Sequence, residues 1–118
     1  MTHPFFPGGF TSIGISELNR AGLQVRAYDV TDPATGAVTR VTSPDPGRML
    51  ISGKASDANF FDPTQLRGIR KTAPYFHDNS AATLLDVLNH YNLLFTVTNT
   101  PTVPTAEFNG LIAYLNRL

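Results

Sequence analysis

The sequence predicts a mainly α-helical fragment of a domain, with long loops and one small β-hairpin near the N-terminus. Apolar residues recur at helical spacing in two segments of the C-terminal third. Clusters of proline, glycine, serine and threonine divide the remainder into short stretches, which favours loops. One pair of β-branched runs flanks a turn sequence, which is the pattern of a hairpin.

The N-terminal part is expected to be irregular before the hairpin. Residues 1–22 read as coil with one helical turn near residues 16–20. Residues 23–43 form the hairpin, because LQVRAYDV and AVTRVTS alternate and TDPATG between them begins with Asp-Pro and closes with Gly. The third part, residues 44–118, is expected to form one further unit.

Two short and two long helices are predicted within that third part. Asp45, Pro46 and Gly53 mark the ends of a short helix, and a second short helix runs from about residue 63 to 70. Thr83 and Asp86 approximate a capping box. The apolar positions of the helix that follows are Leu84, Val87, Leu88, Tyr91, Leu94 and Phe95. The last helix begins near Thr105 and is expected to bury Phe108, Leu111, Ile112, Leu115 and Leu118.

The composition excludes several classes of function. A net charge of +0 argues against a nucleic-acid partner. The absence of cysteine excludes disulfides, thiolate zinc sites and thioether attachment of haem. No segment approaches the roughly 20 apolar residues of a membrane span. The N-terminus lacks the basic region and apolar run of a signal peptide.

The loop APYFHDNS is the strongest candidate for a binding site. Pro74 keeps the chain out of a helix, and Asn79 tolerates positive φ. The loop projects Tyr75, Phe76 and His77 before a helix. Together with the nearby basic residues Arg67, Arg70 and Lys71, these side chains could line a pocket for a flat, partly anionic ligand. In the alternative interpretation, Tyr75 and Phe76 belong to the core and His77 satisfies backbone groups of the loop. His90 is interpreted as lying at the solvent edge.

The stretch DPGRMLISGKASDANFFDPTQLRGIRKTAPYFHDNSAATLLDVLNHYN, residues 45–92, resembles the C-terminal part of the c-type cytochrome domain of bacterial di-haem cytochrome c peroxidases. The resemblance implies that residues 44–118 are the C-terminal part of a cytochrome c-like helical domain around haem c. It also implies electron transfer or peroxide reduction and a periplasmic location. The CxxCH motif of that family is absent. Either the reading frame is truncated and the motif lies upstream of Met1, or the domain has lost its haem.

The resemblance also implies roles for individual residues. Tyr91, fourteen residues after His77, stands where the family places an axial iron ligand, and tyrosinate is one of the ligands that haem iron accepts. His77 would hydrogen-bond a haem propionate or tune a proton path, and Arg67 would pair with a propionate or a buried carboxylate. The alternatives are that Tyr91 is a core residue with its hydroxyl hydrogen-bonded, and that His77 stabilises the turn. Met49 is expected to pack in the core.

The predicted function is therefore a haem-associated electron-transfer domain that is inactive as an enzyme by itself. Its expected partners are haem and either a redox protein or the missing N-terminal haem-binding segment. The alternative is a cytochrome-like module without haem that acts in protein interaction or small-molecule binding.

Overall fold

A computed structural model describes residues 10–118. The chain divides into two compact units, and their boundary in the sequence lies between Pro63 and Thr64. Of the described residues, 36% are helical and 17% lie in strands or bridges, so the prediction of a mainly α-helical, cytochrome c-like fold is wrong. The division into residues 1–22, 23–43 and 44–118 stays a prediction, and the first nine residues lie outside the described part of the chain.

The physical reason for the error lies in glycines that stop helices early. The helix expected over residues 63–70 is only the 3-10 helix η2 (Ile69–Lys71), because Gly68 before it has φ 74°. The helix expected after Asp45 is only α2 (Met49–Ser52), because Gly47 at φ 59° precedes it and Gly53 at φ 69° ends it. A positive φ is incompatible with a continuing right-handed helix.

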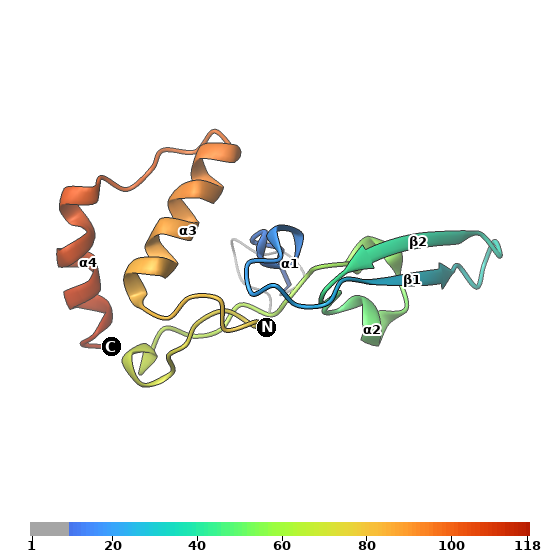
Figure 1. The fold of residues 1–118 in the computed structure, drawn as a ribbon, viewed down its shortest axis with the longest axis horizontal. Coiled ribbons are helices and arrows are strands. Elements are labelled where there is room, and N and C mark those ends of the chain that lie inside the picture. Colours follow the sequence, from blue (N-terminus) through green and yellow to red (C-terminus); the bar gives the residue numbers. More distant parts are fainter. Residues whose placement is uncertain (1–9) are drawn as a thin grey trace. The chain divides into compact units, whose positions relative to one another are not determined.

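Unit 1 contains the predicted hairpin and several very short helical turns (Figure 1). Its elements in chain order are α1 (Ile15–Leu18), β1 (Arg26–Thr31), β2 (Val38–Ser43), α2 (Met49–Ser52) and the 3-10 helix η1 (Ala55–Asp57). The strands pair antiparallel in one unbroken register, from Arg26 opposite Ser43 to Thr31 opposite Val38. The hairpin prediction is therefore confirmed.

The turn at residues 45–48 organises the interior of unit 1. Ser16 Oγ donates to the backbone carbonyl of Asp45 over 2.7 Å, and the Gly47 N–H donates to the Asp45 carboxylate over 3.0 Å. The Arg48 N–H donates to the carbonyl of Phe60 over 2.9 Å. Ile15, Pro46 and Met49 are buried around this turn, which confirms the expected core position of Met49.

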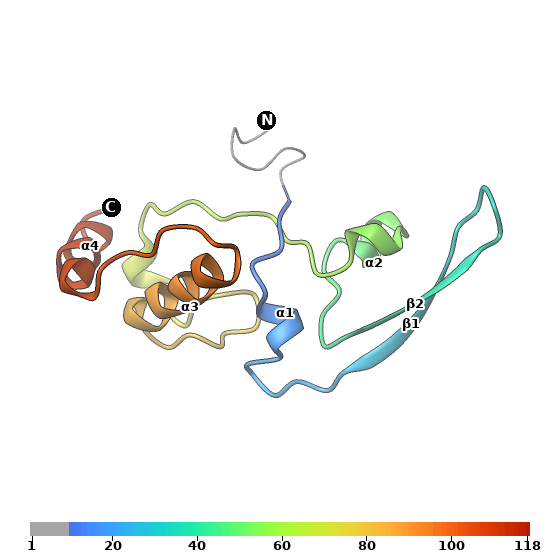
Figure 2. The ribbon, with the colours of Figure 1, turned by 90° about the horizontal axis from the view of Figure 1, so that it is seen from above.

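Unit 2 is a pair of helices preceded by a long loop (Figures 1 and 2). Its elements are η2, α3 (Leu84–Val97), the 3-10 helix η3 (Thr105–Glu107) and α4 (Phe108–Leu115). The capping box of Thr83 and Asp86 is present. The buried apolar residues of the helix pair are Leu84, Leu88, Phe108 and Leu115. Leu118, expected to be buried, is 39% exposed because α4 ends at Leu115.

No helix in residues 10–118 is both long enough and apolar enough to cross a membrane.

Candidate functional site

The loop of residues 74–81 has a defined conformation before α3. The Tyr75 N–H donates to the Ala81 carbonyl over 2.7 Å, and this antiparallel bridge closes the loop at its base. The Tyr75 hydroxyl donates to the Ile69 carbonyl over 3.0 Å, which ties the loop to η2. Asn79 has φ 59°, as its tolerance of the left-handed region predicts. The loop can therefore hold the ring of Phe76 in one place.

Phe76 itself has φ 69°, a conformation that is rare for a bulky residue and costs roughly 1–3 kcal/mol. Its ring packs edge-on against His90, with 4.9 Å between the centroids, and lies 6.4 Å from Tyr91. The ring of Tyr91 in turn lies 6.1 Å from the ring of Phe95, measured between centroids. We call these four residues the aromatic cluster. It joins the loop to one side of α3.

His90 belongs to this cluster, and its predicted place at the solvent edge is wrong. Its side chain is buried, with 2% of the residue exposed. The ring of Phe76 reaches α3 from the preceding loop and meets the imidazole. Helical spacing within α3 alone could not reveal that contact.

Tyr91 is half-buried, and burial raises the pKa of its phenol above the ordinary value of 10.0. The phenol is therefore neutral at physiological pH. Ionisation to a ligating phenolate would require a cation close to the oxygen, and ferric iron is a cation of that kind.

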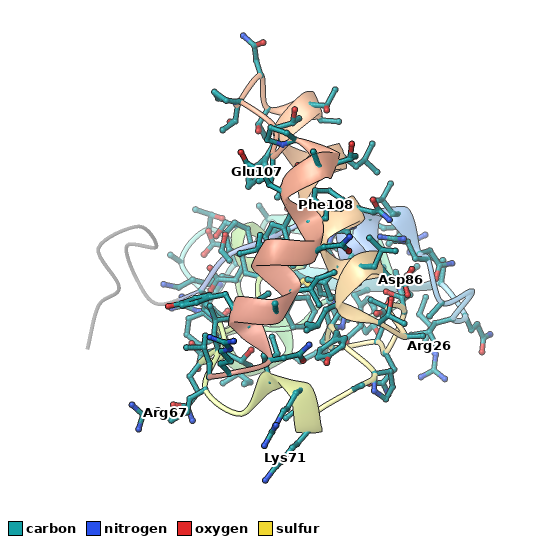
Figure 3. All side chains as sticks on the ribbon, turned by 90° about the vertical axis from the view of Figure 1, so that its left-hand side faces the viewer. Arg26, Arg67, Lys71, Asp86, Glu107 and Phe108 are labelled. Atoms are coloured by element: carbon teal, nitrogen blue, oxygen red, sulfur yellow. The ribbon has the colours of Figure 1, made fainter. Side chains whose placement is uncertain are left out.

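The remaining predicted site residues differ in exposure. Tyr75 is half-buried like Phe76, whereas His77 and Arg67 are exposed. Figure 3 shows Arg67 extending outward from the segment around η2. The structure thus brings Phe76 and Tyr91 together directly, and it holds Tyr75 at the base of the same loop.

Asn92 has a role that the sequence reasoning missed. Its Nδ2 donates to the Val103 carbonyl over 2.8 Å, while the Val103 N–H donates to its Oδ1 over 2.9 Å. The amide thereby imitates a backbone partner and fastens the loop between α3 and α4. An asparagine inside a helix that faces a proline-rich loop was the available signal.

Comparison with characterised proteins relates part of the chain to the cytochrome peroxidases. Cytochrome c551 peroxidase from Nitrosomonas europaea is 50% identical to the chain over 73 residues. This stretch is 62% of the chain and 18% of the relative, so the chain spans less than a fifth of that protein. No protein family profile and no solved structure matches the chain.

The residues present fit one part of a haem site and not another. Attachment of a c-type haem uses the cysteines of CxxCH, and the chain has no cysteine. The aromatic cluster contains three half-buried rings, Phe76, Tyr91 and Phe95, and Tyr91 carries an oxygen of a type that haem iron accepts. In the same loop, Ser80 Oγ is buried without a hydrogen-bond partner among residues 10–118, so a polar group there remains to be satisfied. Within those residues, no three His, Asp or Glu side chains form a metal-binding group.

Proposed function

We propose that this chain supplies one wall of a haem site in a protein related to the cytochrome c peroxidases, and that it serves electron transfer. The observation that carries the proposal is the 50% identity over 73 residues with cytochrome c551 peroxidase. The aromatic cluster supports it, because flat rings around a potential oxygen ligand are suited to a porphyrin face. By analogy with the same family, the protein acts in the periplasm.

Within this proposal each site residue has one task. Tyr91 would offer its phenolic oxygen as a ligand, and Phe76 and Tyr75 would exclude water beside it. The exposed side chains of Arg67 and His77 would bind the propionates while staying in contact with water. Haem, when bound, supplies a centre that takes up and releases one electron. Because the chain has no cysteine, a CxxCH motif in another segment or chain would hold the haem covalently.

A haemin titration followed by the Soret band tests the proposal. The full chain, Tyr91→Phe and the matched control Tyr114→Phe are compared; Tyr114 is an exposed phenol on α4. Tyr91→Phe keeps the packed ring and removes only the oxygen. We expect saturable binding with the same ferric spectrum in the wild type and in Tyr114→Phe. Tyr91→Phe should bind at least about tenfold more weakly, with a shifted spectrum. Identical spectra in all three proteins, or no saturable binding by the wild type, would refute the proposal.

A second candidate function, an interaction module without haem, is favoured by apolar side chains left exposed in both units. Ile51 in α2 is 88% exposed and Val97 at the end of α3 is 76% exposed. Leu50, next to Ile51, is 62% exposed, and adjacent exposed apolar side chains suit a surface that another protein covers. Failure of the wild type to bind haemin would favour this candidate.

A further inference from the structure

Positive charge is concentrated on one short segment of unit 2. Residues 64–77 contain Arg67, Arg70 and Lys71 and no acidic residue, which leaves six cationic and nine acidic residues in the rest of the chain. All three cationic side chains are exposed. This segment therefore carries three positive charges in a chain that is neutral as a whole, with Asp62 and Asp78 as the nearest acidic residues in the sequence.

The cations stand on a hydrogen-bonded turn rather than on a slack loop. We call residues 66–72 the basic turn. The carbonyl of Ile69 accepts hydrogen bonds from the Tyr75 hydroxyl (3.0 Å) and from Thr72 Oγ1 (2.9 Å). The Lys71 N–H donates to the Gly68 carbonyl over 3.0 Å. The backbone that displays the charges is therefore fixed before any partner arrives, which lowers the entropic cost of binding.

Acidic residues of the same unit do not neutralise the basic turn. Among residues 10–118, none forms an ion pair with Arg67, Arg70 or Lys71, whereas Arg40 and Arg48 in unit 1 pair with aspartates. The Asp78 carboxylate accepts from the Ser80 N–H over 3.0 Å, and the Asp86 carboxylate accepts from Thr83 in the capping box. Figure 3 places Glu107 at the opposite end of the unit from Arg67 and Lys71.

An apolar side chain lies within this charged surface. Leu66, directly before Arg67, is 52% exposed. Arginine around a small apolar contact is a composition that protein interfaces favour. We propose that the basic turn is a docking surface for an acidic, partly apolar face of a partner protein. The opposite charges would accelerate the encounter and orient the partner, and Leu66 would add apolar contact.

Binding of a short labelled peptide of alternating glutamate and leucine, followed by fluorescence anisotropy, tests this. The variants Arg70→Gln/Lys71→Gln and Arg26→Gln/Lys54→Gln lose the same charge from exposed positions, the first on the basic turn and the second in unit 1. We expect the first to weaken binding about fivefold and the second by less than about twofold. Salt should weaken binding by the wild type more than by the first variant.

Three outcomes would overturn the proposal. Equal weakening in both variants would mean that only net charge matters. Equal affinity for a glutamine-leucine peptide would mean that charge does not matter. A greater loss for phosphatidylglycerol vesicles than for the acidic peptide in the Arg70→Gln/Lys71→Gln variant would make the surface a membrane contact. Because Arg67 is retained in both variants, failure here leaves the haemin titration unaffected.

Discussion

Unit 1 and unit 2 are each stabilised internally by a different kind of interaction. Unit 1 relies on hydrogen bonds between its loops, and the serines at 16 and 43 are as deeply buried as its apolar residues. Ser43 Oγ donates to Asn59 Oδ1 over 2.6 Å, and Ser16 reaches the Asp45 carbonyl. Unit 2 relies on apolar side chains of two helices, with a capping box where α3 begins. The stability of unit 1 thus depends on hydrogen bonds between loops of fixed conformation. The stability of unit 2 depends on apolar packing between helices, with a few hydrogen bonds.

The difference teaches that one continuous resemblance can cover residues with unlike roles. The family-like stretch begins in the 45–48 turn, where each residue type has a reason within unit 1: the Asp45 carboxylate accepts from a backbone N–H, Gly47 adopts φ 59°, and Arg48 pairs with Asp57. It ends in unit 2, where Phe76 and Tyr91 place aromatic rings together. Only the second group has the chemistry of a binding site. A motif match therefore marks backbone geometry in one unit and a candidate site in the other.

Gly47→Ala is expected to have the largest effect, because it attacks the geometry of unit 1. A Cβ at this position would collide with the Phe60 carbonyl oxygen and lie 2.9 Å from the ring of Phe61. Its φ of 59° adds strain. We expect a loss of about 3 kcal/mol in the free energy of unfolding, measured by urea denaturation. Amide NMR signals of unit 1 should lose dispersion while those of unit 2 persist.

Gly36→Ala is the matched control for that substitution. Gly36 closes the hairpin turn with φ 73°, and no atom lies within 4 Å of the position of a Cβ. Only the backbone strain remains, so the loss should be about 1 kcal/mol. Equal losses in the two variants would show that the close approach of Gly47 to Phe60 does not stabilise unit 1.

The sequence predicted the elements whose signals are local. The hairpin, the capping box at Thr83 and the start of the last helix near Thr105 all follow from neighbouring residues. The 45–48 turn could not be predicted in the same way, because its partners include Ser16 and Phe60, which are distant in sequence. The fold class failed for a different reason, since Gly47 and Gly68 at positive φ shorten the helices expected there.

The candidate site was predictable in its residue types and not in its arrangement. The aromatic residues before α3 singled out Phe76, and the family resemblance singled out Tyr91 within α3; the binding roles of both stay predictions. The burial of His90 depends on the positive φ of Phe76, which turns that ring onto α3. Glycine and asparagine signal positive φ in a sequence, but phenylalanine does not. The contact between the rings of Phe76 and His90 therefore had no signal in the sequence.

Asn92→Ala is expected to have an intermediate effect and to act on unit 2. It removes two hydrogen bonds to Val103 and leaves that residue's backbone N–H and carbonyl without them. We expect a loss of about 2 kcal/mol in the urea-derived free energy of unfolding. The control is Asn89→Ala on the exposed side of α3, which should be neutral or slightly stabilising because alanine favours the helix. If both variants behaved alike, the amide of Asn92 would not stabilise unit 2.

The smallest effect is expected at the exposed ion pair of the hairpin. Arg40 donates two hydrogen bonds to Asp29, at 2.7 and 2.8 Å, and these hold the pKa of Asp29 below its ordinary value of 3.8. Since the folded-state pKa is the lower one, the pair stabilises the chain above about pH 3.8, and this contribution is lost as the pH falls through the folded value.

Arg40→Gln should raise the pKa of Asp29 towards 3.8, as measured by carboxyl NMR titration. Arg40→Lys should give an intermediate value, because lysine keeps the charge without the paired geometry. The midpoint of urea unfolding near neutral pH should barely change, since both side chains are more than half exposed. A large change in that midpoint would mean that the hairpin depends on this one ion pair, unlike the 45–48 turn, which several hydrogen bonds hold.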